Sequence, residues 1–189
     1  EAATTATAGS HGLETAVSAQ QIFQRGGGRA LLAAFSGPAP PARYWVVRFF
    51  RPGQTEEFDV VVRPDTGGVA GFSHRLPETA AGAQPTLAAA EEMAVQFLTA
   101  QRVPAAGMQL KDAVQQQRPA RTDTHLVWEA AGQNLPPGIT TRVEVDLAGS
   151  SIAAFARWYH VPDDQVRAYR KATLLATLLS AAKGLLYAA

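Results

Sequence analysis

The sequence contains no cysteine and few charged residues. The absence of cysteine excludes disulfide bonds, thiol catalysis and cysteine-ligated zinc. Charged residues make up 17% of the chain and the net charge is +1, so there is no excess of basic residues for binding nucleic acid. The pattern of a signal peptide, a basic N-terminus followed by an apolar stretch, is not visible.

Hydrophobic residues make up 47% of the 189 residues. This is enough to form the core of one large domain or of two small ones packed together. Residues 1–10 are mostly small and of low complexity, which predicts a disordered N-terminal segment.

Two segments ahead of strand-like sequence are expected to be helical. Residues 13–24 repeat their apolar residues at helical spacing, and Gly26-Gly27-Gly28 ends the pattern. Residues 87–101 follow Pro85-Thr86 and place their apolar residues on one side.

Seven segments are expected to be strands, because aromatic and β-branched residues concentrate in them and turn residues separate most of them. They are residues 44–50, 58–63, 69–74, 108–115, 125–130, 142–147 and 151–159. Consecutive strands joined by tight turns, such as the Pro-Asp-Thr-Gly-Gly run at 64–68, form antiparallel meanders.

The two halves of the chain resemble each other. Residues 60–72 (VVVRPDTGGVAGF) match residues 143–155 (VEVDLAGSSIAAF), with a valine ten residues before a phenylalanine in both. The two helical segments share a spacing of seven residues from alanine to phenylalanine, Ala16 to Phe23 and Ala90 to Phe97. Coincidence between two generic hairpins is the alternative, but the repeated order of helix and sheet favours duplication.

The predicted fold is therefore α+β, with two tandem units of a helix and an antiparallel sheet. The first unit covers residues 11–84 and the second covers residues 85–164. A C-terminal helix is expected within residues 165–189, where it could lie next to a membrane.

The turn pattern V-x-V-x-P-D-T-G-x-V-x-G-F, at residues 60–72, resembles the PepSY-like, cystatin-related modules of bacterial extracytoplasmic proteins. The stretch that contains it, together with R-x-x-x-x-L-V-W-E at residues 121–129, is similar to the region ahead of the membrane helices in bacterial CAAX-protease-like (CPBP) intramembrane metalloproteases. The resemblance covers about residues 43–170.

The resemblance implies an extracytoplasmic, membrane-associated and non-catalytic accessory domain. Such a domain would bind or present an extended substrate, or regulate the enzyme, through a face or an edge of its sheet. Its partner would be the membrane portion of its own parent protein or an extended peptide, and no nucleic acid. The alternative is a free-standing domain that binds a lipid or a small ligand.

The protease chemistry of that family does not transfer to these residues. Its paired-glutamate motif requires a downstream arginine, but Gln96 stands in that place after Glu91-Glu92. His160 and Asp164 have helical spacing, but Pro162 between them disfavours a helix. Neither pair lies in an apolar span of about 20 residues, which a membrane helix needs.

No other catalytic or metal-binding pattern is found. The four histidines, His11, His74, His125 and His160, lack the short-spaced pair typical of zinc sites. Asp123 beside His125, or Glu78 after His74, would complete only a partial site, so these histidines are interpreted as ordinary strand and turn residues. We therefore predict no catalytic residue, no metal ligand and no cofactor, and the ligand-binding residues stay unknown.

Two glycine motifs are interpreted as structural. Gly26-Gly27-Gly28-Arg29 lacks the preceding strand and the Gly-Lys-Ser/Thr ending of a phosphate-binding loop. Asp65-Thr66-Gly67 matches the Asp-Thr-Gly of aspartic proteases, but the second half of the chain has no matching copy.

Aromatic residues are concentrated in the expected strands. We expect most of them in the core and the rest on a face that could line a groove for an extended peptide or a lipid. The set comprises Tyr44, Trp45, Phe49, Phe50, Trp128, Trp158 and Tyr159.

The last expected helix, residues 172–189, is rich in leucine but interrupted by Lys183. It is too short and too charged for a complete membrane span. Arg167, Arg170 and Lys171 precede it, and basic residues beside a membrane segment favour the cytoplasmic side. This cluster counts against the extracytoplasmic location that the resemblance implies.

Overall fold

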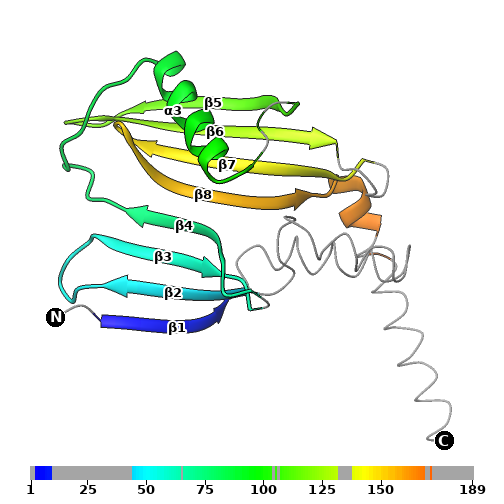
Figure 1. Cartoon of the computed structure of the whole chain (residues 1–189), viewed down its shortest axis with the longest axis horizontal. Helices are drawn as coiled ribbons and strands as arrows, with labels where there is room; N and C mark the ends of the chain where they lie inside the picture. Colours follow the sequence, from blue (N-terminus) through cyan, green and yellow to red (C-terminus); the bar gives the residue numbers. More distant parts are fainter. Residues whose placement is uncertain are drawn as a thin grey trace, which may run out of the picture.

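The computed structural model describes residues 3–9, 44–64, 66–103, 105, 107–131, 138–168 and 171. These residues form one antiparallel sheet of eight strands, with a long helix, α3 (Leu87–Ala100), packed on one side (Figure 1). The strands are β1 (Ala3–Gly9), β2 (Tyr44–Phe50), β3 (Glu57–Val62), β4 (Val69–Arg75), β5 (Gln109–Gln117), β6 (Thr122–Ala131), β7 (Thr140–Ala148) and β8 (Ser151–His160).

The sheet consists of two four-stranded meanders joined side by side. The strand order is β1-β2-β3-β4-β8-β7-β6-β5, so each meander pairs strands that follow one another along the chain. The two meanders meet where β4 pairs with β8, through Phe72 opposite Phe155 and Ser73 opposite Ala154. We call this pairing the seam.

The predicted fold class was wrong. We expected two tandem units, each with its own helix and sheet, but the strands of both halves form a single continuous sheet. The alternation of apolar and polar residues along a strand indicates which side chains share a face. It does not indicate which other strand the last strand of a meander will pair with. Residues 163–168 are also helical, whereas the helices expected at 13–24 and 172–189 lie outside the described residues.

The N-terminal segment also differs from the expectation of disorder. Residues 3–9 form β1 and pair with β2 over seven residues, from Ala3 opposite Phe50 to Gly9 opposite Tyr44. Ordering such a segment is possible because its backbone hydrogen bonds are made with a neighbouring strand, and threonine favours strands.

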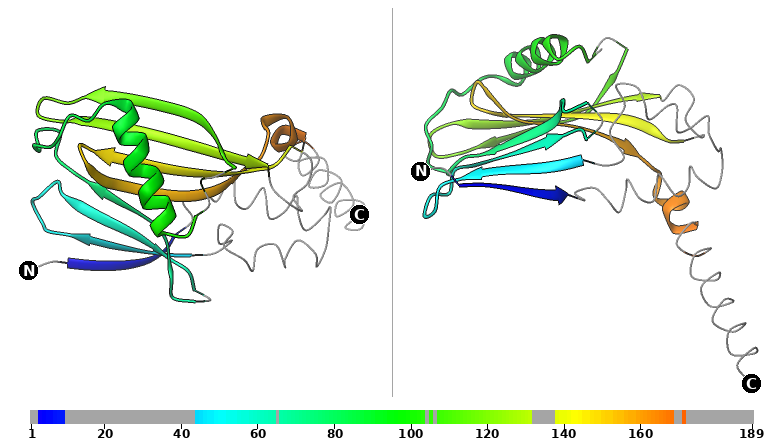
Figure 2. Two further views of the ribbon diagram at one scale, coloured as in Figure 1. Left: turned by 45° about the horizontal axis from the view of Figure 1, so that its top comes forward. Right: turned by 60° about the horizontal axis from the view of Figure 1, so that its bottom comes forward.

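Helix α3 covers the second meander. Thr86 caps its N-terminus by accepting a hydrogen bond from the backbone N–H of Ala89 at 3.3 Å. Ala90, Ala94 and Leu98, at helical spacing, are fully buried against β6 and β7. Figure 2 shows the helix lying over the β5–β8 part of the sheet. The core under it includes the strand residues Leu126, Trp128, Val143, Val145, Leu147 and Phe155.

The seam is closely packed on both the backbone and the side-chain level. The ring of Phe97 from α3 makes edge contacts with Phe72 (6.1 Å between centroids) and with Phe155 (5.3 Å). Beside them, a Cβ placed on Gly71 would lie 2.7 Å from the carbonyl oxygen of Phe155. Glycine at 71 therefore lets the backbones of β4 and β8 approach each other.

The register modifies the repeat that the sequence indicates. The matched segments equate Val62 with Val145, each ten residues before its phenylalanine. In the sheet, however, Val145 lies opposite Phe155, whereas Val60 lies opposite Phe72. The two hairpins are therefore offset by two residues, because the β3–β4 turn is longer.

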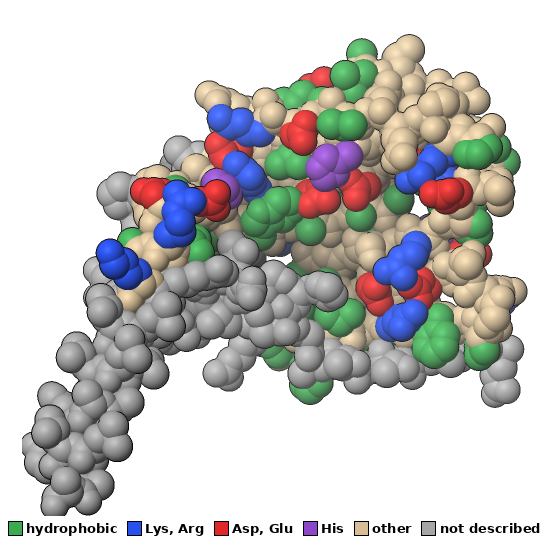
Figure 3. Space-filling view, turned by 180° about the vertical axis from the view of Figure 1, so that it is seen from behind, with side chains coloured by type: hydrophobic (Ala, Val, Ile, Leu, Met, Phe, Trp, Pro, Cys, Tyr) green, Lys and Arg blue, Asp and Glu red, His purple; other side chains and the backbone are tan. Residues whose placement is uncertain are grey.

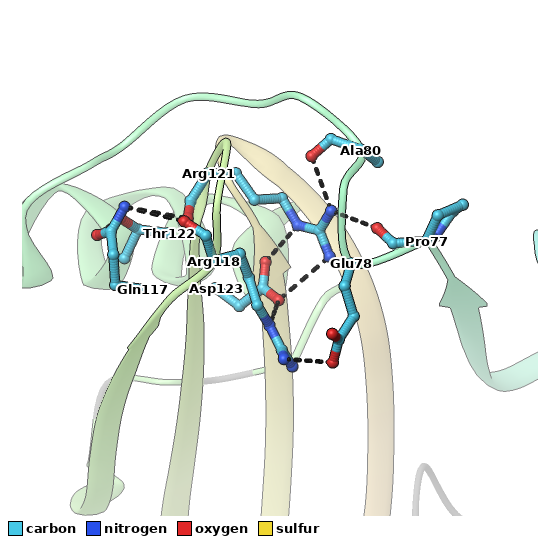
Figure 4. Close-up of polar contacts among 8 residues, drawn as sticks. All are labelled: Pro77, Glu78, Ala80, Gln117, Arg118, Arg121, Thr122 and Asp123. Atoms are coloured by element: carbon cyan, nitrogen blue, oxygen red, sulfur yellow. Dashed lines mark hydrogen bonds and ion pairs between the residues drawn. The ribbon is translucent and has the colours of Figure 1, made fainter.

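The connection from β4 to α3 is fixed to the β5–β6 turn by Arg121, whose side chain is only 4% exposed. Its guanidinium donates hydrogen bonds to the carbonyl oxygens of Pro77 (2.7 Å) and Ala80 (2.9 Å) and to the carboxylate of Asp123 (2.6 Å) (Figure 4). Arg118 joins the same group by bonding Asp123. Burial alone would raise the pKa of Asp123, but the hydrogen bonds from both arginines outweigh it and lower the pKa.

Candidate functional site

An exposed aromatic surface lies on β2 and β3, on the same side of the sheet as α3. Trp45, Phe49 and Phe58 are 48%, 39% and 41% exposed, respectively. We call these three residues, with Val47, Val60 and Val62 between them, the aromatic face.

The register of the sheet determines where these side chains point. Val47 lies opposite Val60, Val60 opposite Phe72, and Phe72 opposite Phe155, which contacts α3 through Phe97. Directly opposite residues point to the same side of a sheet, and alternate residues along a strand share a side. Trp45 and Phe49 are therefore on the α3 side.

The two sides of β2 and β3 have different chemistry. On the side away from α3, Glu57 is buried and forms ion pairs with Arg48 and Arg75. On the α3 side the same strands present only apolar side chains, from Trp45 to Phe58. The α3 side of this hairpin is thus wholly apolar, whereas the other side mixes the charged Arg48, Glu57 and Asp59 with apolar residues.

Helix α3 does not extend over this hairpin. It contacts β6 and β7, and the ring of Phe97 reaches no further than Phe72 of β4 within the described residues. Figure 2 shows the β1–β3 part of the sheet extending beyond the helix. In the described part of the chain, then, no helix covers Trp45, Phe49 or Phe58, and large exposed apolar groups side by side are typical of an interaction surface.

Histidine 74 lies at the margin of the aromatic face. Its ring stacks on Phe58 at 3.8 Å between centroids, and its Nε2 lies 2.9 Å from a carboxylate oxygen of Glu56. The partner considered from the sequence, Glu78, instead pairs with Arg118 at 2.9 Å. No metal-like grouping therefore forms at His74 among the described residues.

Histidine 125 lies in β6, on the side of the sheet away from α3. Asp123, its neighbour in sequence, is held by arginines. The Nδ1 atom of His125 lies instead 2.6 Å from a carboxylate oxygen of Asp146 and 3.5 Å from one of Glu144, both in β7. The sequence contains the signal for this group, two acids at alternate positions of one strand, but only the register joins them to the histidine.

The remaining candidates do not assemble into a site. His160 is the last residue of β8, and Asp164 belongs to the helical segment that begins after Pro162, so no helix holds both. Glu92 is exposed on α3 and accepts a hydrogen bond from Gln96 at 3.3 Å. Gly67 lies in the β3–β4 turn with φ of 69°, while Asp65, His11 and residues 26–29 lie outside the described residues.

The other aromatic residues of the expected set are largely enclosed. Trp128 and Tyr159 are buried, and burial raises the pKa of Tyr159 to about 12. Tyr44, Phe50 and Trp158 are half-buried. Of the aromatic residues singled out from the sequence, then, Trp45 and Phe49 are the exposed ones, and the sequence did not single out Phe58.

No family model, curated protein or solved structure matches this chain. Among the described residues, no helix has both the length and the apolar character that a membrane crossing requires. The resemblance to PepSY-like and CAAX-protease-like regions therefore stays a prediction.

Proposed function

We propose that this chain is a non-catalytic binding domain whose aromatic face receives an amphipathic helix of a partner protein. The observation that supports this most directly is the exposure of Trp45, Phe49 and Phe58 side by side on the α3 side of the sheet. Exposing three large aromatic groups together is unfavourable in water, so a surface of this kind is typical of docking.

A helix fits this surface because α3 already occupies the layer above the same face. A second helix beside α3 would continue that layer over β2 and β3. Trp45 and Phe49 are four residues apart along one strand, about 13 Å, which matches about nine residues of helix. A docked helix of two to three turns therefore contacts all three aromatic side chains.

The β5 edge of the sheet fits a partner less well than the face. The edge strand β5 exposes Lys111 and Asp112 and ends in Gln115-Gln116-Gln117. Charged and polar side chains on an edge strand oppose pairing with an added strand. We therefore favour binding through the sheet face over addition of an extended segment to the β5 edge.

Attachment to a membrane-bound metallopeptidase, which the sequence resemblance implies, is a separate proposal. The aromatic face does not depend on it. The test is the parent gene: several apolar spans and a Glu-Glu-x-x-x-Arg motif downstream of residue 189 support it, and a stop codon directly after that residue contradicts it.

Tryptophan fluorescence tests binding at the aromatic face directly. Of the three tryptophans, Trp128 is buried, Trp158 is half-buried on the opposite side, and Trp45 is exposed, so Trp45 reports on this surface. The probe is a synthetic 18-residue amphipathic helix of leucine and lysine. We expect a saturable blue shift in the full chain and its loss in the double variant Phe49→Ser/Phe58→Ser.

The matched control is Val114→Ser, since Val114 is 51% exposed on β5 but points to the other side of the sheet, opposite His125. This variant should bind the peptide like the unmodified chain. A blue shift with phosphatidylcholine vesicles but not with the peptide would replace the helix by a lipid surface. No shift with either probe, or equal binding by the double variant, would contradict the proposal.

A further inference from the structure

A group of three metal-ligating side chains lies on the side of the sheet opposite α3 and the aromatic face. His125 in β6 is directly opposite Asp146 in β7, and Glu144 is two residues before Asp146, so all three side chains point to the same side. Figure 3 shows this side of the molecule, where acidic side chains gather next to a histidine.

The distances within the group are close to those of a zinc site. The ligand atoms of His125, Glu144 and Asp146 all lie within 4.8 Å of one another. A tetrahedral Zn²⁺ with bonds of about 2.0–2.1 Å holds its ligand atoms about 3.3 Å apart. The Nδ1 of His125 is already 3.5 Å from Glu144, and its 2.6 Å contact with Asp146 needs only a small side-chain rotation to open.

The charge of this group distinguishes it from the other carboxylates that form ion pairs on the same side. Each of the others has arginine or lysine partners: Glu57 with Arg48 and Arg75, Glu129 with Arg142 and Lys111, and Asp123 with Arg118 and Arg121. Among the described residues, Glu144 and Asp146 have no arginine or lysine within ion-pair distance and share only His125.

Two adjacent carboxylates without a basic partner are unfavourable where they are half-buried. Burial raises the pKa of Glu144, the negative charge of Asp146 raises it further, and His125 offsets only part of this. A divalent cation between the three side chains would remove this repulsion. The cluster therefore has both the geometry and the charge that a cation needs.

The backbone beneath the group is rigidly held. Strands β6 and β7 are internal, each paired on both sides. Between the three ligand positions, Leu126 and Val145 point to the opposite side and are fully buried under α3. Ligands on central strands over a packed core keep their separation, which is the condition for specific metal binding.

We propose that His125, Glu144 and Asp146 bind one Zn²⁺ ion. One imidazole nitrogen with two carboxylate oxygens suits a transition-metal ion better than Mg²⁺ or Ca²⁺, which prefer oxygen ligands alone. The three side chains are half-buried, so the fourth position faces solvent and holds water.

Isothermal titration calorimetry of the full chain with ZnCl₂, after removal of metal with EDTA, tests the site. We expect one saturable equivalent per chain that excess Mg²⁺ and Ca²⁺ do not displace. His125→Gln, Glu144→Gln and Asp146→Asn should each weaken binding at least about tenfold, since losing even an outer-shell partner has this effect. The matched control is Asp59→Asn, a half-buried acid on the same side of β3, which should bind like the unmodified chain.

A second measurement follows the ligand itself. NMR signals of the His125 ring should shift on addition of Zn²⁺, while those of His74 and His160 do not. Circular dichroism establishes that each variant is folded. Absence of saturable binding at millimolar Zn²⁺, or equal binding by all three ligand variants, overturns the proposal. Because the site and the aromatic face are on opposite sides of the sheet, failure of one leaves the other intact.

Discussion

The seam between the two meanders makes a quantitative prediction at Gly71. An alanine there places its Cβ 2.7 Å from the carbonyl oxygen of Phe155, whereas ordinary contacts begin at 3.4 Å. The obstacle is backbone, so it cannot rotate away, and β4 must move from β8 by several tenths of an ångström. The pairing that resists this movement consists of only Phe72 with Phe155 and Ser73 with Ala154.

The magnitude follows from two opposing effects. Forcing an extra methyl group into a packed site costs about 1–3 kcal/mol. Replacing glycine by alanine also restricts the conformations of the unfolded chain, which stabilises the folded state by about 0.4–1 kcal/mol and offsets part of that cost. We therefore expect Gly71→Ala to lower the free energy of unfolding by about 1–2 kcal/mol, measured by urea denaturation followed by circular dichroism.

The control is Gly68→Ala in the same hairpin, where the added Cβ would meet only the hydroxyl oxygen of the Thr66 side chain, at 3.3 Å. Gly68→Ala should change the free energy of unfolding by no more than about 0.5 kcal/mol. Hydrogen exchange adds a spatial criterion: Gly71→Ala should speed exchange in β2 and β3 more than in β6 and β7. If the two glycine variants are equally stable, or if exchange rises uniformly, the seam does not have the role assigned to it.

Three further changes test the core, the Arg121 contacts and the acid response. Leu98→Ala should lower the free energy of unfolding, measured by urea denaturation, by about 2–5 kcal/mol, because Leu98 is fully buried. Leu87→Ala, at an exposed position of the same helix, should lower it far less. Arg121→Ala should lower the free energy of unfolding by about 3 kcal/mol in the same measurement, because two carbonyl oxygens lose their hydrogen-bond donor and Asp123 loses one of its two arginine partners. A decrease below about 1 kcal/mol would contradict this. Burial alone would raise the pKa of Glu129, but hydrogen bonds from its basic and hydroxyl partners lower it, so its contribution to stability is present at neutral pH and is lost as the pH falls below about 4. Glu129→Gln should therefore be less stable at pH 7 and lose less stability on acidification, measured by urea denaturation at several pH values.

Local sequence identifies the elements of this fold but not how the last strands pair. The expected strand at 151–159 is β8 (Ser151–His160), and the expected helix at 87–101 is α3 (Leu87–Ala100). Alternation and turn residues are local signals, so they place such elements within a few residues. The pairing of β4 with β8 joins segments about 80 residues apart in the sequence through two pairs of opposite residues. No local sequence pattern predicts such a pairing.

The same limit applies to the two surfaces. In the sequence, Trp45 and Trp128 are equivalent, each an aromatic residue in a strand. Trp128 is buried because it lies in the meander that α3 covers, and Trp45 is exposed because it lies in the other. His125 shows the effect of register: its neighbour Asp123 is held by arginines, and its real partners come from the next strand.

The buried residues are distributed unequally between the two meanders. All the residues of the buried cluster under α3 belong to α3, to the α3–β5 connection or to β6–β8, whereas β2–β4 contribute Glu57, Ala70 and Gly71 as buried residues. A strand pair with so few buried side chains gains little from its own core, so β2 and β3 depend on the seam and on whatever covers the aromatic face. Binding of a ligand to the aromatic face should consequently raise the hydrogen-exchange protection of β2 and β3. Gly71→Ala weakens the seam, so it should also weaken binding of the helical probe, although Gly71 is not part of the aromatic face. If that variant is destabilised yet binds the probe unchanged, the aromatic face is organised independently of the second meander.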